Sequence, residues 1–216
     1  LVACDYPHQA MILSSEDEGT TWSEPHYVHV DSSGNPDTGM GTSLTGLGGG
    51  EVMCIAGSRW VSHDAGVSWE NAGAVAPAPD GKPWYMWDPP WVEKAIGEHG
   101  ERTLFETGYT AVRAPETGPG YQQGYIRASR DSGKTWSEAI QPPQWEGVSE
   151  VALIRAQNGD LVGACRTDIP AGMSGIDHLE GLGVSISKDN GLSWSAVTKL
   201  YRSEERRVGK ECRSRW

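Results

Sequence analysis

The stretch Ser129-Arg130-Asp131-Ser132-Gly133-Lys134-Thr135-Trp136 contains the pattern that decides the fold, Ser-x-Asp-x-Gly-x-x-Trp. The pattern occurs four times, at residues 15–22, 62–69, 129–136 and 187–194. The aspartates of successive copies are 47, 67 and 58 residues apart, at Asp17, Asp64, Asp131 and Asp189. A motif that returns at such intervals indicates a structural repeat, slightly longer than the roughly 40–50 residues of common β-sheet repeats. We therefore expect one β-sheet for each copy.

Each copy has the composition of a tight turn between two β-strands. An Asp side chain can accept hydrogen bonds from backbone N–H groups of its own turn, and Gly can adopt the positive φ that such turns need. The Trp begins the returning strand and offers a large apolar face for burial. Short apolar runs precede the copies, at residues 10–13, 59–61, 124–127 and 183–186. We therefore predict a structural role for the four aspartates and for Trp22, Trp69, Trp136 and Trp194.

The four copies resemble the Asp-boxes, or BNR repeats, of the sialidase-like β-propellers. In that family the box lies on the outer hairpin of a blade, between its third and fourth strands and away from the active site. The resemblance implies an all-β propeller of four-stranded antiparallel blades, with about four of six blades present in residues 1–202. Boxes also occur in xyloglucan-degrading propellers and in sortilin-type receptors, so they predict the fold more strongly than the function.

The composition favours short strands joined by many turns. The 216 residues include 28 Gly, 13 Pro and 10 Trp but one Phe, and no segment reads as a helix of ordinary length. No apolar run approaches the roughly 20 residues of a membrane-spanning helix, so we predict no membrane span. The net charge of −11 argues against a nucleic-acid partner, because phosphate binding requires a basic surface.

The two ends of the sequence differ from its middle. Residues 202–216 hold six of the 18 Lys and Arg residues. Residues 203–216 resemble a translated vector or adapter sequence, and we exclude them from the fold as a non-native tail; a native basic tail is the alternative. The sequence begins without Met and inside an apolar run at residues 1–4, which predicts that part of the propeller precedes it.

The cysteines and histidines argue against a disulfide framework and against a metal site. Cys4, Cys54 and Cys165 each end a similar apolar run, and their odd number predicts buried free thiols. They do not identify the compartment, and a secreted or periplasmic location is compatible with the sequence. His26 and His29 have a spacing that could serve a metal, but no third ligand is evident. We therefore predict a solvated loop and no cofactor.

The resemblance also implies a chemistry. Sialidases bind the substrate carboxylate with three arginines and use a Tyr nucleophile, a Glu that polarises the Tyr, and an Asp as acid and base. Guanidinium groups suit a carboxylate because they form charge-assisted, often bidentate, hydrogen bonds. A Tyr hydroxyl with a pKa of about 10 needs an adjacent carboxylate to attack at neutral pH. The partner that this implies is a sialylated or other acidic glycan.

One part of the family's site matches this sequence well. In the family, the Glu opens the first strand of a blade, and an Arg lies sixteen residues later at the end of the next strand. Glu150 and Arg166 have this spacing and flank the turn signal Asn158-Gly159. The resemblance therefore implies that Glu150 is the catalytic carboxylate and that Arg166 binds substrate. The alternative is a surface Glu and a surface Arg on an ordinary hairpin.

The match for the acid/base residue is looser. Asp5 lies ten residues before Ser15 of the first box, which is the spacing of the family's catalytic Asp. An Asp shortly before a Pro is equally typical of a turn, and His8 is the substitute if this loop is read differently.

Three further residues are candidates to line a substrate site: Arg59, Trp87 and Asp88. The last two belong to the segment 84–91, whose aromatic and Pro residues argue against a regular central strand. Arg59 could equally lie at a strand edge, and the tryptophans of this segment could pack between strands.

Residues 1–202 contain no match for the first arginine, the third arginine or the nucleophilic Tyr of the family. We predict that the intact parent protein is an exo-sialidase-like retaining glycoside hydrolase, and that this chain alone is inactive. A non-catalytic carbohydrate- or protein-binding propeller is the alternative. A glycosidase for neutral polysaccharides, with two catalytic carboxylates, is a third reading that Arg166 disfavours.

Overall fold

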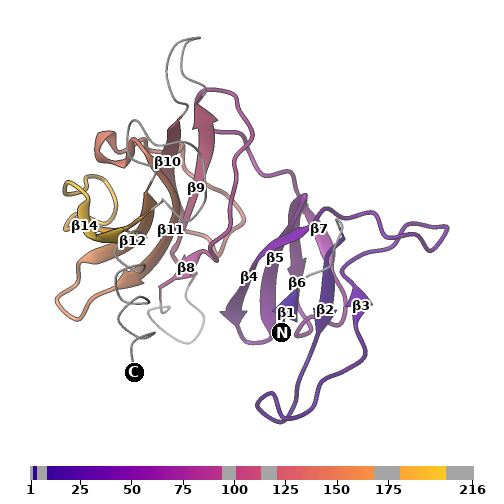
Figure 1. Ribbon diagram of the computed structural model, residues 1–216. Helices are drawn as coiled ribbons and strands as arrows, with labels where there is room; N and C mark the ends of the chain where they lie inside the picture. Colours follow the sequence, from indigo (N-terminus) through magenta and orange to yellow (C-terminus); the bar gives the residue numbers. More distant parts are fainter. Residues whose placement is uncertain (1, 4–8, 94–100, 113–120, 168–180, 203–216) are drawn as a thin grey trace, which may run out of the picture. The chain divides into compact units, whose positions relative to one another are not determined.

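The computed structural model of the protein describes residues 2–3, 9–93, 101–112, 121–167 and 181–202 (Figure 1). Within these ranges the secondary structure is almost entirely β, and the one 3-10 helix, η1, spans Pro143–Trp145. The strands are β1 Val2–Ala3, β2 Met11–Leu13, β3 His26–Tyr27, β4 Gly41–Gly48, β5 Glu51–Ala56, β6 Ser58–Ser62, β7 Glu70–Gly73, β8 Trp91–Val92, β9 Leu104–Val112, β10 Tyr121–Ser129, β11 Val148–Arg155, β12 Leu161–Thr167, β13 Gly181–Ser187 and β14 Thr198–Arg202.

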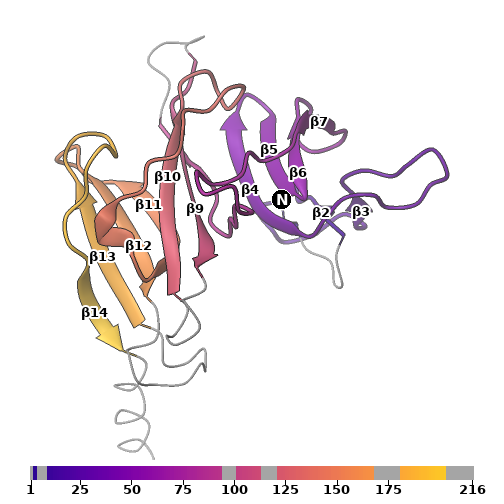
Figure 2. The same cartoon turned by 90° about the horizontal axis from the view of Figure 1, so that it is seen from above.

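The described strands form four sheets, with the orders β1-β2-β3, β4-β5-β6-β7, β10-β9-β8 and β11-β12-β13-β14. Strands that are consecutive in sequence are neighbours in every sheet, as Figure 2 shows for β11 to β14. The pairs of the β4–β7 and β11–β14 sheets are all antiparallel. The prediction of an all-β chain built from antiparallel sheets is therefore confirmed. The number of blades and a closed propeller stay predictions.

The runs that the sequence analysis assigned to strands are strands in the structure. The runs before the four motif copies lie in β2, β6, β10 and β13. The segment 84–91 forms no long strand. Tyr85 makes an isolated bridge to Tyr109, and β8 begins only at Trp91. The Pro residues of this segment lack the N–H groups that a continuous ladder requires.

The four motif turns have the same internal hydrogen bonds. The Asp carboxylate accepts one from the backbone N–H of the seventh motif residue, and the N···O distance is 2.8 Å in each of the four turns. The Ser hydroxyl accepts one from the Gly N–H at 2.7 to 2.8 Å, and the Trp indole donates one to the Gly carbonyl at 3.1 Å. In the β4–β7 and β11–β14 sheets this turn joins the third and fourth strands.

Two features of the turn go beyond the pattern used in the sequence analysis. The residue before the Gly also has positive φ, between 58° and 60°, at Glu18, Ala65, Ser132 and Asn190. The seventh position is always Thr or Ser, and its hydroxyl donates to the second carboxylate oxygen of the Asp. The signal for this second feature is present in all four copies of the sequence, at Thr21, Ser68, Thr135 and Ser193.

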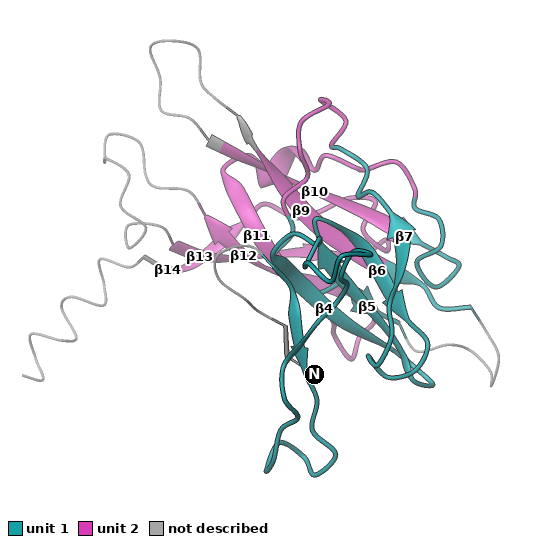
Figure 3. Ribbon diagram, turned by 90° about the vertical axis from the view of Figure 1, so that its right-hand side faces the viewer, with its two compact units in different colours: residues 1–77, 86–104, 129–136 teal, residues 78–85, 105–128, 137–216 magenta. Residues whose placement is uncertain are grey.

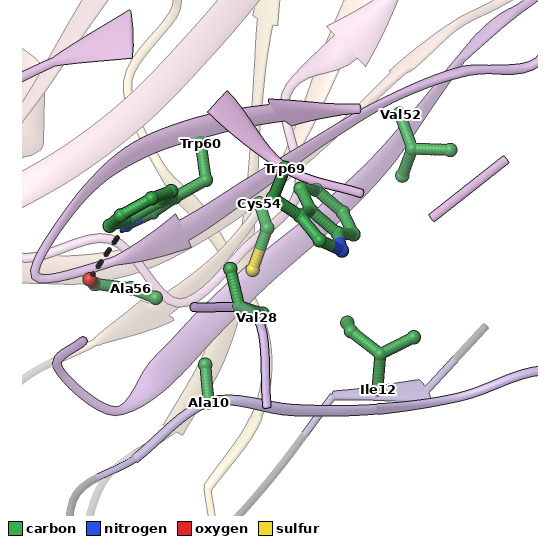
Figure 4. Close-up of a cluster of buried hydrophobic side chains, with 8 residues drawn as sticks. All are labelled: Ala10, Ile12, Val28, Val52, Cys54, Ala56, Trp60 and Trp69. Carbon is green, nitrogen blue, oxygen red and sulfur yellow. Dashed lines mark hydrogen bonds between the residues drawn. The ribbon is translucent and has the colours of Figure 1, made fainter. Parts of the chain in front are cut away.

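The motif tryptophans differ in burial although their turns are alike. Trp69 lies in a buried cluster with Ile12 of β2 and Cys54 of β5 (Figure 4). Trp136 packs against a second cluster that contains Met53. Trp22 is 47% exposed, contrary to the expectation that each motif Trp is buried. Trp69 and Trp136 pack against residues of the preceding sheet, and no sheet precedes β1–β3 among the described residues.

Two of the three cysteines before residue 203 lie in the described core. Cys54 on β5 and Cys165 on β12 are both fully buried. Burial raises the pKa of the Cys54 thiol to about 12, so this side chain behaves as a small apolar group. Cys4 lies outside the described residues.

The chain divides into two compact units (Figure 3). Unit 1 comprises residues 1–77, 86–104 and 129–136, and unit 2 comprises residues 78–85, 105–128 and 137–216. In unit 2, Trp145 of η1 is fully buried and its ring centroid lies 4.6 Å from that of Trp194. Each unit therefore buries a motif Trp of its own.

The motif glycine Gly133 should tolerate substitution less well than an open glycine with a similar backbone conformation. Gly133 has φ +88°, and a Cβ there would lie 2.4 Å from Met53 Cε, whereas Gly34 has φ +81° and open space around it. We expect Gly34→Ala to cost about 1–2 kcal/mol through backbone strain, and Gly133→Ala to cost about 1 kcal/mol more, because the terminal methyl group of the buried Met53 must shift. Urea denaturation of both variants measures this, and equal losses would contradict the packing argument.

The motif carboxylates should make stability depend on pH in the acid range. Hydrogen bonds from the backbone and the hydroxyl of Thr21, and from Ser15, lower the pKa of Asp17 to about 2. A carboxyl group with a lowered folded pKa stabilises the native state above its unfolded pKa of about 4, and this contribution is lost as pH falls toward 2.

We therefore expect Asp17→Asn to lower the melting temperature at about pH 7, and the difference from the native protein to shrink by about pH 2. The adjacent Glu16→Gln variant is the control, because Glu16 is exposed and no hydrogen bond joins its carboxylate to the turn among the described residues. Melting curves across this pH range decide the point. A difference that does not change with pH would show that the Asp17 charge is unimportant.

Candidate functional site

Glu150 and Arg166 form an ion pair across two neighbouring strands of unit 2. Arg166 Nη1 donates to Glu150 Oε1 at 2.8 Å, and each side chain is 33% exposed. The register between β11 and β12 shifts between Val148 and Val151, and Glu150 lies in this irregular stretch near the beginning of β11. Arg166 lies one residue before the end of β12. The structure thus brings together the two residues that the sequence analysis paired.

The local sequence explains this geometry. The turn between the strands contains Asn158 and Gly159, and Gly159 has φ +91°. Ala156 N–H donates to the Asp160 carbonyl at 2.9 Å and closes the hairpin, which pairs Arg155 with Leu161. A hairpin whose turn is defined has a defined register, so residues near its two open ends face each other.

The Glu150–Arg166 pair is suited to ligand binding more than to stabilising the fold. An ion pair with this much exposure contributes about 0–1 kcal/mol. Glu150 holds the guanidinium in place, and because a third of the Arg166 side chain is exposed, its positive charge can attract an external carboxylate.

The other predicted site residues belong to unit 1 or lie outside the described residues. Asp5 and its substitute His8 lie outside the described residues. Trp87, which is 45% exposed, and the half-buried Asp88 belong to unit 1 together with Arg59, whereas Glu150 and Arg166 belong to unit 2. Roles for these residues at a substrate site stay predictions.

Arg59 is a packed side chain rather than an exposed one. It is 4% exposed, its guanidinium carbon lies 4.4 Å from the ring centroid of Trp136, and its Nη1 lies 3.1 Å from Met53 Sδ. Contact between a guanidinium and an indole face is favourable because the ring face carries negative charge density. These contacts link β6 to the motif turn at residues 129–136.

A second ion pair, between Glu106 on β9 and Arg127 on β10, was not found by sequence reasoning. Arg127 Nε donates to Glu106 Oε1 at 2.6 Å, and Nη2 of the same guanidinium forms an ion pair with this oxygen. Glu106 is fully buried and Arg127 is 4% exposed. A possible signal was the presence of single charged residues within the apolar runs Leu104-Phe105-Glu106 and Tyr125-Ile126-Arg127.

Trp84 covers the buried Glu106–Arg127 pair. The guanidinium carbon of Arg127 lies 4.6 Å from the Trp84 ring centroid, and Tyr125 lies on the same indole at 5.7 Å. Gly108 makes room for the indole, because a Cβ there would be 2.2 Å from Trp84 Nε1. The contacts of Trp84 are therefore those of a packed side chain rather than of one that lines a substrate site.

The two ion pairs should respond differently to loss of their arginines. Arg127→Met leaves the Glu106 carboxylate buried, and we expect a loss of about 3–5 kcal/mol. Arg166→Met removes a partly exposed charge and should cost less than about 1 kcal/mol. The double variant Glu106→Met/Arg127→Met should recover part of the loss, since no uncompensated charge remains. Urea denaturation measures all three, and equal costs for the two single variants would refute the distinction.

The described residues show no metal centre. His26 Nε2 lies 3.2 Å from the Gly66 carbonyl oxygen, and His29 Nδ1 lies 2.5 Å from Asp37 Oδ1. Across the part of the chain that the structure describes, no three His, Cys, Asp or Glu side chains lie close enough together to hold a metal ion. In the same part of the chain, no helix has the length and apolar character to cross a membrane.

Comparison with known proteins reveals similarity at the level of fold. No protein-family model and no curated protein matches the chain. A protein of unknown function from Dyadobacter fermentans has a TM-score of 0.61 at 18% identity, with 92% of this chain and 60% of that chain covered. An α-L-arabinofuranosidase of family GH93 from Fusarium graminearum has a TM-score of 0.50 at 15% identity, with 91% and 60% covered.

A third solved structure is the NanB sialidase of Streptococcus pneumoniae, with a TM-score of 0.50 at 18% identity. The alignment covers 87% of this chain and 27% of the sialidase. The chain therefore spans between about a quarter and three fifths of the length of these three proteins. At these identities the likeness concerns the fold, and the fold alone does not assign a function.

Proposed function

We propose that this chain contributes Glu150 and Arg166 to the site of a sialidase-like glycoside hydrolase that acts on sialylated or other acidic glycans. The observation that carries the proposal is the 2.8 Å contact between Arg166 Nη1 and Glu150 Oε1 on adjacent strands. The sialidase resemblance implies the same pair, and their contact is what supports the proposal.

The acidic character of the substrate rests on Arg166. A guanidinium binds a sugar carboxylate through two parallel N–H···O hydrogen bonds, and a neutral sugar offers no such partner. In the proposed mechanism Glu150 has two functions. It orients the guanidinium, and it polarises the Tyr nucleophile that a sialidase-like mechanism requires.

The likeness of fold to a sialidase and to an arabinofuranosidase supports a carbohydrate-active protein. The proposal of an acidic sugar rests on Arg166 and not on these structural neighbours.

Asp5 is the proposed acid/base residue, and Arg59, Trp87 and Asp88 are the other residues proposed for the site. The motif aspartates are proposed to be structural, as their hydrogen bonds within the turns suggest. We assign residues 1–202 to the propeller and residues 203–216 to a non-native tail.

The proposal is tested by binding, because binding requires no nucleophile. We expect N-acetylneuraminic acid to bind the 216-residue chain with a dissociation constant in the millimolar range, measured by saturation-transfer NMR. Arg166→Lys loses the bidentate geometry and should weaken binding about tenfold. Arg155→Lys is the matched control, because Arg155 lies on the same hairpin and bonds to the Gly159 carbonyl and to Asn190.

Either of two results would count against the proposal. One is the absence of any binding of N-acetylneuraminic acid, and the other is binding that Arg166→Lys and Arg155→Lys reduce equally. In the first case a non-catalytic propeller that recognises a different carbohydrate or a protein becomes the better account, and in the second case Arg166 has no specific part in the binding.

A further inference from the structure

Unit 1 contains a cavity of about 320 Å³ at the turn between β5 and β6. Its side-chain lining comes from three places: the connection between β3 and β4, the beginning of β6, and the motif turn with β7. The lining side chains are His29, Asp37, Ser58, Trp60, Trp69 and Asn71. Figure 4 shows Trp60, Trp69 and Ala56 from the adjoining buried cluster. The Glu150–Arg166 pair belongs to unit 2 and has no part in this cavity.

A hydrogen-bonded His–Asp pair lies on one wall of the cavity. His29 Nδ1 is 2.5 Å from Asp37 Oδ1, and the two side chains are 40% and 44% exposed. The imidazole stacks on Trp60, with ring centroids 5.0 Å apart and an interplanar angle of 29°. The indole is itself held by a hydrogen bond from Trp60 Nε1 to the Ala56 carbonyl at 3.3 Å. The ring of His29 is therefore positioned on two sides before any ligand binds.

Another part of the cavity lining is closely packed backbone. Gly39 N–H donates to the Ala56 carbonyl at 3.1 Å, and a Cβ on Gly39 would lie 2.8 Å from the Gly57 backbone. Asn71 Oδ1 accepts a hydrogen bond from Gly73 N–H at 2.8 Å, which fixes the amide. Because the carbonyl of this amide is engaged, its NH₂ group is available as a donor.

Several polar atoms of the lining have no hydrogen-bond partner within the described residues: Asp37 Oδ2, His29 Nε2, Asn71 Nδ2 and Ser58 Oγ. Together they comprise an anionic acceptor, an amide donor and two groups that can act either way. Sugar hydroxyl groups both donate and accept, so they complement such a mixture. The carboxylate of Asp37 disfavours an anionic ligand.

Other ligands and activities fit the cavity less well. His29 and Asp37 are two ligands without a third nearby in the described chain, so a metal ion would be poorly held. Ser58 makes no hydrogen bond to His29 among the described residues, so the His–Asp pair does not activate a nucleophile there. The volume is at the lower end of the roughly 300–1,000 Å³ of small-molecule sites, which suits a single sugar ring.

We propose that this cavity binds one neutral monosaccharide unit of a glycan. Asp37 and His29 hold one pair of hydroxyl groups, Asn71 donates to a further oxygen, and the edges of Trp60 and Trp69 contact the apolar C–H face of the sugar. This site goes beyond the proposed hydrolase function, because it uses other residues and takes a sugar of a different charge class.

The test uses methyl glycosides of glucose, galactose and mannose as probes with the 216-residue chain. We expect at least one to bind with a millimolar dissociation constant in saturation-transfer NMR. Asp37→Asn and Asn71→Ala should each weaken that binding about tenfold, the size of one lost hydrogen bond. Glu51→Gln is the matched control, because Glu51 pairs with His63 at 3.1 Å with the same exposure as Asp37 but does not line the cavity. Unchanged melting temperatures show that the variants are folded.

The proposal is wrong if none of the three glycosides binds, or if Asp37→Asn and Asn71→Ala bind them as the native protein does. The Arg166→Lys variant separates this result from the hydrolase proposal. It should leave binding of the neutral glycoside unchanged while it weakens binding of N-acetylneuraminic acid, so each proposal can fail without the other.

Discussion

The hydrogen bonds of the motif carboxylates are the interaction on which the rest of the structure depends. In each turn one Asp side chain holds the backbone and the hydroxyl of the residue before the Trp. This holds two successive residues at positive φ, which β-sheet neighbours do not otherwise adopt. The Gly and the Trp of the turn can then pack against other segments. In the third turn, Gly133 lies against Met53 and Trp136 lies against Arg59. A polar interaction within eight residues thus creates an apolar contact between segments far apart in sequence.

The two arginine–glutamate pairs show how burial separates charges that only stabilise the fold from charges that a ligand can reach. The Glu106–Arg127 pair is enclosed beneath Trp84, so each charge needs the other and neither can be offered to a ligand without great cost. The Glu150–Arg166 pair is one-third exposed and gains little stability from its own attraction, so it can exchange water for a ligand. The same two residue types on adjacent strands therefore have different consequences, and side-chain accessibility is what separates them.

The pair at Glu150 and Arg166 could be predicted because both residues lie on one hairpin with a recognisable Asn-Gly turn, so their spacing implies their contact. The cavity at His29 could not be predicted in this way. His29 and Asp37 lie in a long connection, and Trp60 and Asn71 lie on strands that follow it. Nothing in the local pattern around His29 indicates that Trp60 stacks on its ring, because that contact depends on how the connection folds back over β6. The sequence supported only a choice between a weak metal pair and a solvated loop.

The sequence by itself determined the turns and the strands that flank them, because the hydrogen bonds of a Ser-x-Asp-x-Gly-x-x-Trp segment are made within the segment. It also determined the all-β class, since alternating short apolar runs and turn residues allow little else. The tertiary structure decided which side chains are buried. It left Trp22 exposed and buried Trp194 with the same local motif, and it placed Arg59 against the indole of Trp136 and Arg127 against that of Trp84. Burial depends on which sheet packs against the turn, and the eight residues of the turn do not determine which sheet that is.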